Sequence, residues 1–125
     1  MLGFLGRFGR AEGLKQLDAA LRAVDLHPAL VPEAVKLTTL RQLEAATGKP
    51  TPHDFAAAAE LLAYCLVGPE AFTRATDATL AEAVETRIEA ATRAGDSLDA
   101  RLVLLTLHAR LTQPEVVARF GLELG

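Results

Sequence analysis

The stretch that decides the fold is residues 54–67, DFAAAAELLAYCLV, in which only Asp54 and Glu60 carry a charge. Arranged on a helix, the stretch is apolar on every face except at these two residues. A helix without a polar face must lie inside a bundle or across a subunit contact, because it has no side to present to water. With 14 residues it is also shorter than the roughly 20 residues that cross a bilayer. The stretch therefore predicts a buried helix in an all-α protein.

Residues on either side of this stretch mark the ends of the buried helix. Thr51 is suited to cap the first turn, Pro52 to occupy the first helical position, and Asp54 to complete a capping box. Gly68 and Pro69 follow the last apolar residue and predict the end of the helix. The buried helix is thus expected near 52–67.

Apolar residues spaced three and four apart predict further helices before and after the buried one. The segment 97–112 has two apolar faces, which again indicates a core position or a contact between subunits. Short connections between such helices predict a compact all-α bundle of five to six helices, with inner helices near 52–67 and 97–112. The other helices are expected over 14–26, 32–48 and 79–95, followed by a short helix that begins at a Thr112–Glu115 capping box and ends near Phe120; a helical turn is expected over 70–75.

Length and composition limit the class of protein. The chain has 125 residues, half of them apolar, which fits one folded domain, expected over 11–125. Its formal net charge is −3, which argues against a general affinity for nucleic acid. Cys65 is the only cysteine and lies within the apolar stretch, so a packing role is expected and a disulfide is excluded within the chain.

The first ten residues, MLGFLGRFGR, are interpreted as a flexible apolar and basic N-terminal arm, residues 1–10. Phe4 and Phe8 are its candidate interaction residues, with Arg7 and Arg10 beside them. The order of charge and apolar residues does not fit a secretory signal, so a cytoplasmic location is expected. Contact with a partner groove or with a membrane surface is one reading of the arm; the favoured reading is a segment that folds over the core or stays disordered.

Three glutamates supply the best pattern for a metal. Glu82, Glu85 and Glu89 are spaced three and four apart, so they share one helix face and could offer oxygen ligands to a hard cation. The favoured alternative is a solvated face with a supporting Glu89–Arg93 pair. No Glu-x-x-His or His-Glu-x-x-His pattern occurs, and neither a metal nor a cofactor is expected.

Two histidines are candidates for polar chemistry. His53 falls in the first turn of the buried helix, where the helix dipole favours a neutral imidazole that could act as a base. His108 falls on the predicted inner helix 97–112 and is interpreted as a core or interface residue. Neither histidine is close in sequence to a nucleophile.

The segment 111–121, LTQPEVVARFG, resembles the first helix and turn of a helix-turn-helix domain, with Thr112, Ala118 and Gly121 at matching positions. Only four residues follow that turn, so the recognition helix that reads DNA is not expected in this chain. Nucleic-acid binding is therefore not predicted by the resemblance.

These patterns favour a non-enzymatic helical protein-interaction or adaptor module. Its expected partner is another protein or a second copy in a homodimer, with Leu104, Leu107 and Leu111 as further interaction residues. The alternative hypothesis is a small-ligand-binding or enzymatic bundle with a pocket between helices that uses His53 or His108.

Overall fold

The chain is all-helical in the computed structural model, which describes residues 2–123 and, of these, the side chains from Arg10 onward. Within that range there are seven α-helices and one short 3-10 turn, and no strand. The fold class predicted from the sequence is confirmed, and α4 forms where only a helical turn was expected. The elements are α1 (Leu2–Ala23), η1 (Pro28–Leu30), α2 (Glu33–Thr47), α3 (Pro52–Val67), α4 (Pro69–Ala75), α5 (Ala78–Ala94), α6 (Leu98–His108) and α7 (Pro114–Phe120).

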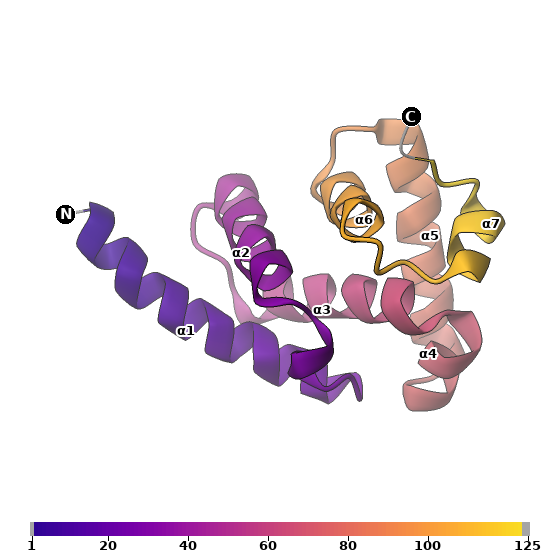
Figure 1. Cartoon of the computed structure of the whole chain (residues 1–125), viewed down its shortest axis with the longest axis horizontal. Coiled ribbons are helices and arrows are strands. Elements are labelled where there is room, and N and C mark those ends of the chain that lie inside the picture. Colours follow the sequence, from indigo (N-terminus) through magenta and orange to yellow (C-terminus); the bar gives the residue numbers. More distant parts are fainter. Residues whose placement is uncertain (1, 124–125) are drawn as a thin grey trace.

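Helix α3 forms the centre of the bundle, as its sequence predicts. Figure 1 shows α3 running between α1 and α2 at one end of the molecule and α4, α5 and α7 at the other. It packs against α1, α4, α5 and α6, and Phe55 and nearly all residues from Ala58 to Cys65 are buried. The predicted capping box is confirmed: Thr51 Oγ1 accepts from the amide of Asp54 at 3.2 Å, and the Asp54 carboxylate accepts from the amide of Thr51 at 2.7 Å.

Helix α6 is the second inner helix. It packs against α2, α3 and α5, and Leu102, Val103 and Thr106 are buried. The opposite face is less well covered, because Leu104 keeps 44% of its surface exposed. The two apolar faces predicted for this helix are therefore covered to different extents by the chain itself.

Helix α1 begins at Leu2, well before the start predicted at Leu14. The glycines of the first turns led to the expectation of a non-helical segment, since glycine weakens a helix. Gly13, however, is buried in the contact with α2, where an added Cβ would lie 3.1 Å from Leu40 Cδ2. An added Cβ would crowd the Leu40 side chain, so glycine suits the close approach of the two helices here. The side chains of Phe4 and Phe8 lie outside the described residues.

The start of α7 differs from the prediction. Its N-cap residue is Gln113, which makes no side-chain capping bond, so the expected capping box at Thr112 is wrong. The Thr112 hydroxyl donates to Thr106 Oγ1 of α6 at 2.8 Å. The amide of Gln113 donates to the carbonyl of Cys65 at 2.8 Å, and its Nε2 donates to the carbonyl of Leu66 at 2.9 Å. These tertiary bonds compete successfully with local capping, and they hold α7 against the end of α3.

Candidate functional site

An apolar cavity of about 310 Å³ lies where α5 ends beside α6 and the residues that follow α7. We call it the Leu104 cavity. Leu104 is one of two large apolar side chains that are exposed between Arg10 and Glu123; the other is Leu30, in η1. The cavity is lined by Ala91, Thr92, Gly95, Val103, Leu104, Leu107, Gly121, Leu122 and Glu123.

The structure brings together two of the three interaction residues predicted on α6 and the segment after it. Leu104 and Leu107 both line the Leu104 cavity, and Leu107 also packs against the core. Leu111 is half-buried against the core and is not part of this lining. The apolar surface available to a partner therefore includes fewer of these residues than the three predicted, and Leu104 is the most exposed of them.

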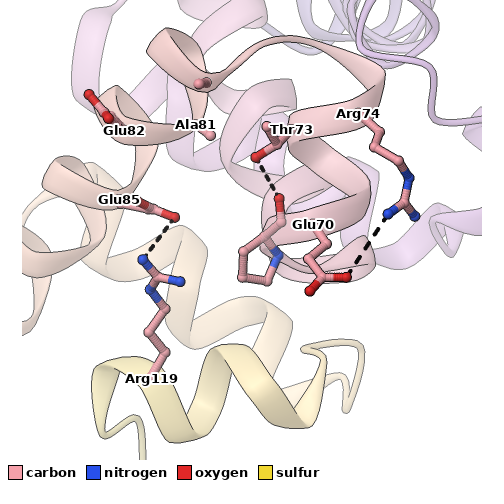
Figure 2. A pocket seen from close by; sticks show the side chains of 9 residues that line it. Glu70, Thr73, Arg74, Ala81, Glu82, Glu85 and Arg119 are labelled. Carbon is pink, nitrogen blue, oxygen red and sulfur yellow. Dashed lines mark hydrogen bonds and ion pairs between the residues drawn. The ribbon is translucent and has the colours of Figure 1, made fainter.

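A second, larger cavity of about 440 Å³ lies between α4, α5 and the end of α7 (Figure 2). We call it the charged cavity. Its charged side chains come from three helices: Glu70 and Arg74 from α4, Glu82 and Glu85 from α5, and Arg119 from α7. Pro69, Thr73, Ala78 and Ala81 complete the lining.

Glu85 connects this cavity to the protein core. Its Oε2 accepts a hydrogen bond from the Tyr64 hydroxyl at 2.6 Å and lies 3.4 Å from Nη2 of Arg119. The Tyr64 ring is fully buried between Phe72 and Phe120, with centroid distances of 5.5 Å and 6.2 Å in edge-to-face geometry. Burial raises the pKa of Tyr64 above its ordinary value, and the hydrogen bond to Glu85 and its charge raise it further. Tyr64 therefore remains a neutral donor that fixes the position of the carboxylate.

The three glutamates predicted as weak metal candidates do not act together in the structure. Glu82 and Glu85 line the charged cavity, whereas Glu89 is exposed and lies outside its lining. Glu85 is already bound by Tyr64 and Arg119. Among the described side chains, no group of three or more His, Cys, Asp or Glu is placed to hold a metal ion.

Both candidate histidines lie on the surface. His53 is exposed in the first turn of α3, and His108 is exposed at the end of α6. Neither lines the Leu104 cavity, the charged cavity or a smaller cavity of about 210 Å³ that lies between α1, α2 and the start of α3. The structure thus separates both histidines from these three cavities.

Cys65 is fully buried in α3. Burial raises the pKa of its thiol to about 11, while a hydrogen bond with Thr106 acts in the opposite direction. A thiol in this state is a poor nucleophile at neutral pH, because the reactive form is the thiolate. This supports the packing role expected from the sequence.

Arg87 forms an ion-pair network that the sequence analysis did not find. Its Nε and Nη2 donate to both carboxylate oxygens of Asp99 at 3.1 Å and 2.9 Å, and Nη2 also donates to the carbonyl of Ala57 at 3.0 Å. Nη1 lies 3.7 Å from Glu60, the charged residue inside the apolar stretch. The sequence could have indicated the need for this network, because Glu60 is a carboxylate on an inner helix and such a group needs a cationic partner.

Tyr64 was missed for a similar reason. It is the only polar aromatic side chain in the apolar stretch, and a buried tyrosine hydroxyl usually requires a hydrogen-bond partner. The sequence could have indicated that need, but it could not have indicated that Glu85 and Arg119 would meet it. Both come from helices that are distant along the chain.

Comparison with known protein families, curated proteins and solved structures finds no match to this chain. No helix among the described residues is both long enough and apolar enough to cross a membrane. The functional argument therefore depends on the two cavities and on the side chains that line them.

Proposed function

We propose that this chain is a non-enzymatic, cytoplasmic protein-interaction module, and that its partner is a second copy of itself. One observation carries the proposal: Leu104 is 44% exposed at the edge of an apolar cavity of about 310 Å³ that is lined by Val103, Leu107 and Leu122. An exposed leucine alone is common on protein surfaces. An exposed leucine at the edge of a mostly apolar cavity is a better candidate for a contact surface.

The arrangement of these residues supports the proposal of self-association. A two-fold dimer uses the same surface patch on both subunits, so the patch must be complementary to itself. Here a projecting side chain, Leu104, adjoins a hollow lined by Leu107 and Leu122. A two-fold axis between them would let each Leu104 enter the cavity of the other subunit. Full burial of one leucine contributes about 1.5–3 kcal/mol, and the symmetric contact would bury two.

The test is the oligomeric state of the full chain and of two matched variants. Sedimentation velocity at about 50 µM should show a dimer for the wild-type chain, which requires a dissociation constant on the order of micromolar. Leu104→Glu should be monomeric, because a carboxylate cannot enter the apolar cavity without losing its hydration. Leu30→Glu is the control, since Leu30 is 62% exposed in η1 and lies outside the cavity.

The outcome can contradict the proposal in two ways. A monomeric wild-type chain at this concentration would remove self-association. A dimer that persists in Leu104→Glu would move the contact to another surface. Helical circular dichroism of each variant should match the wild-type spectrum, which shows that the substitutions leave the fold intact.

A further inference from the structure

Helix α1 begins well before it reaches the rest of the bundle. Figure 1 shows its first turns lying past α2 and past the start of α3. Arg10, Ala11 and Glu12 are all exposed, and Gly13 is the first buried residue among the side chains that the structure describes. Successive residues of a helix are turned by about 100°, so three exposed neighbours cover most of its circumference. The described contact of α1 with the bundle therefore begins at Gly13.

The apolar residues of these first turns share one side of the helix. They are Leu2, Phe4, Leu5 and Phe8. Seven residues make nearly two helical turns, so Leu5 and Phe8 occupy the side that carries Glu12 and Lys15 further along α1. Glu12 and Lys15 are both exposed. The apolar side of the first turns is therefore the side of α1 that faces away from the bundle.

The other side of the first turns is basic. Gly13 and Leu17 are buried and mark the side of α1 that packs against the bundle. The residues seven positions earlier are Gly6 and Arg10, and Arg7 lies one turn before Arg10. The two sides thus exchange character along one continuous helix. Because the helix is continuous, packing that begins at Gly13 turns the apolar side of the first turns away from the rest of the chain.

The charge of this segment indicates what would cover its apolar side. Arg7 and Arg10 are the only charged residues in the sequence of residues 1–11. The whole chain has a formal net charge of −3, so residues 12–125 carry −5. An anionic surface would attract this end of the molecule and repel the remainder. Phenylalanine and leucine on one side of a helix, with arginine on the other, are typical of segments that lie in the interface of an anionic membrane.

We propose that the first turns of α1 bind the surface of an anionic membrane, with their apolar side in the lipid and their arginines among the phosphate groups. The apolar residues gain from leaving water, and arginine binds phosphate through paired hydrogen bonds. From Leu2 to Glu12 the helix is about 15 Å long, so it can lie in the membrane surface but cannot cross the membrane. The inference does not rest on self-association, because the Leu104 cavity is lined by residues between Ala91 and Glu123.

The test is flotation of the full chain with lipid vesicles. With about 1 mM lipid, most of the chain should float on vesicles of equal parts phosphatidylglycerol and phosphatidylcholine, since a marginal anchor binds with an association constant on the order of 10⁴ M⁻¹. Vesicles of phosphatidylcholine alone should bind the chain at least about fivefold more weakly, which is the effect of one arginine at an anionic surface. Sodium chloride at about 0.5 M should reduce binding to the anionic vesicles, because salt screens this attraction.

Matched variants separate the two sides of the helix. Phe8→Glu should weaken binding by about tenfold or more, because it places a carboxylate where the lipid would be. Leu30→Glu is the control, since it makes the same change of charge at an apolar residue that is 62% exposed in η1. Arg7→Gln should weaken binding by about fivefold, whereas Arg93→Gln, at an exposed position of α5, should have no effect. Phe4→Trp would supply the only tryptophan of the chain, and its emission should shift to the blue with anionic vesicles.

The proposal is overturned if anionic vesicles leave the chain unbound, if neutral vesicles bind it equally well, or if Phe8→Glu binds as tightly as Leu30→Glu. A chain that does not float, but whose sedimentation coefficient falls with Phe8→Glu, would assign the apolar side to a contact with a second copy and remove the membrane. Leu104→Glu should still bind the anionic vesicles, which keeps this result separate from the dimer test.

Discussion

The hydroxyl of Tyr64 lies 2.6 Å from Oε2 of Glu85. Tyr64 is fully buried in α3, whereas Glu85 reaches from α5 to the charged cavity. One hydrogen bond thus links the most buried helix to a solvent-facing site. The carboxylate satisfies a core hydroxyl on one side and presents negative charge on the other.

Tyr64→Phe tests the contribution of this bond to stability. The phenyl ring can keep the contacts with Phe72 and Phe120, so the main change is the lost donor to a charged acceptor. We expect the free energy of unfolding to fall by about 2 kcal/mol, the usual range for a hydrogen bond to a charged group. Urea denaturation measures this change. In a Glu85→Gln background the same substitution should cost less, and equal costs in both backgrounds would show that the bond contributes nothing of its own.

Alkaline titration of the native chain tests the environment of Tyr64. The chain has one tyrosine and no tryptophan, so tyrosinate absorbance reports this residue alone. Its pKa is raised in the folded state, and the unfolded chain ionises near pH 10. Above that pH the unfolded state binds fewer protons than the folded state, so the free energy of unfolding falls as pH rises. Tyrosinate should therefore appear together with loss of helical circular dichroism; ionisation near pH 10 in a chain that stays helical would contradict the burial of Tyr64.

Cys65 should be protected from thiol reagents. The side chain is buried and its pKa is raised to about 11, so both access and thiolate concentration are low at neutral pH. An aromatic disulfide reagent should react about 100-fold more slowly with the native chain than with the urea-unfolded chain. The sign of the pKa shift also predicts that stability is lost as pH rises from 9 toward 11. Equal reaction rates in the two states would place the thiol at the surface.

Gly68 is required between α3 and α4. Its φ is +91°, and the position of an added Cβ is occupied by the carboxylate of Glu115. We expect Gly68→Ala to lower the free energy of unfolding by about 2–3 kcal/mol, from backbone strain and displacement of the Glu115 carboxylate. Gly95→Ala is the control, because Gly95 has a φ of +73° with open space around it, and it should cost only about 1 kcal/mol. Similar losses in the free energy of unfolding for the two variants would mean that the contact with Glu115 does not add to the cost at Gly68.

Arg87 is predicted to hold α3, α5 and α6 together. Arg87→Met removes the paired bonds to Asp99 and leaves Glu60 without its cation, so we expect a loss of about 2 kcal/mol in the free energy of unfolding. Arg87→Lys should recover less than half of this loss, because an ammonium group cannot reproduce the two-pronged bond to Asp99. Thermal or urea unfolding measures both variants. Arg93→Met, an exposed change on the same helix, should be nearly neutral; a comparable loss there would assign the effect to helix propensity.

Local patterns predicted most of the helices and several of their ends. The cap at Thr51 was expected and is present. Within α5, the apolar residues Val84, Ile88 and Ala91 are spaced three and four apart, as expected for this helix, and are buried. These features depend on residues within one or two turns of each other, which is the range that a sequence pattern reports.

Features that depend on contact between distant segments could not be predicted. Gln113 binds carbonyls at the end of α3, which is remote in sequence, and this displaced the local cap expected at Thr112. The Glu82, Glu85 and Glu89 pattern correctly placed three carboxylates on one helix, but only tertiary packing gives Glu85 its partners Tyr64 and Arg119. The start of α1 at Leu2 was missed because three glycines among the first ten residues argue against a helix.

The central position of α3 has a consequence for cutting the chain. Helix α1 rests on this rod and α2 packs against α1 and α6, while α4, α5 and α6 all contact the rod. A cut in the exposed turn at Gly48 and Lys49 would uncover the leucines of the N-terminal fragment, because the helices that pack against them belong to the C-terminal fragment. Mixed together, the two pieces should reassemble spontaneously, so this turn is a natural place to divide the molecule for fragment complementation.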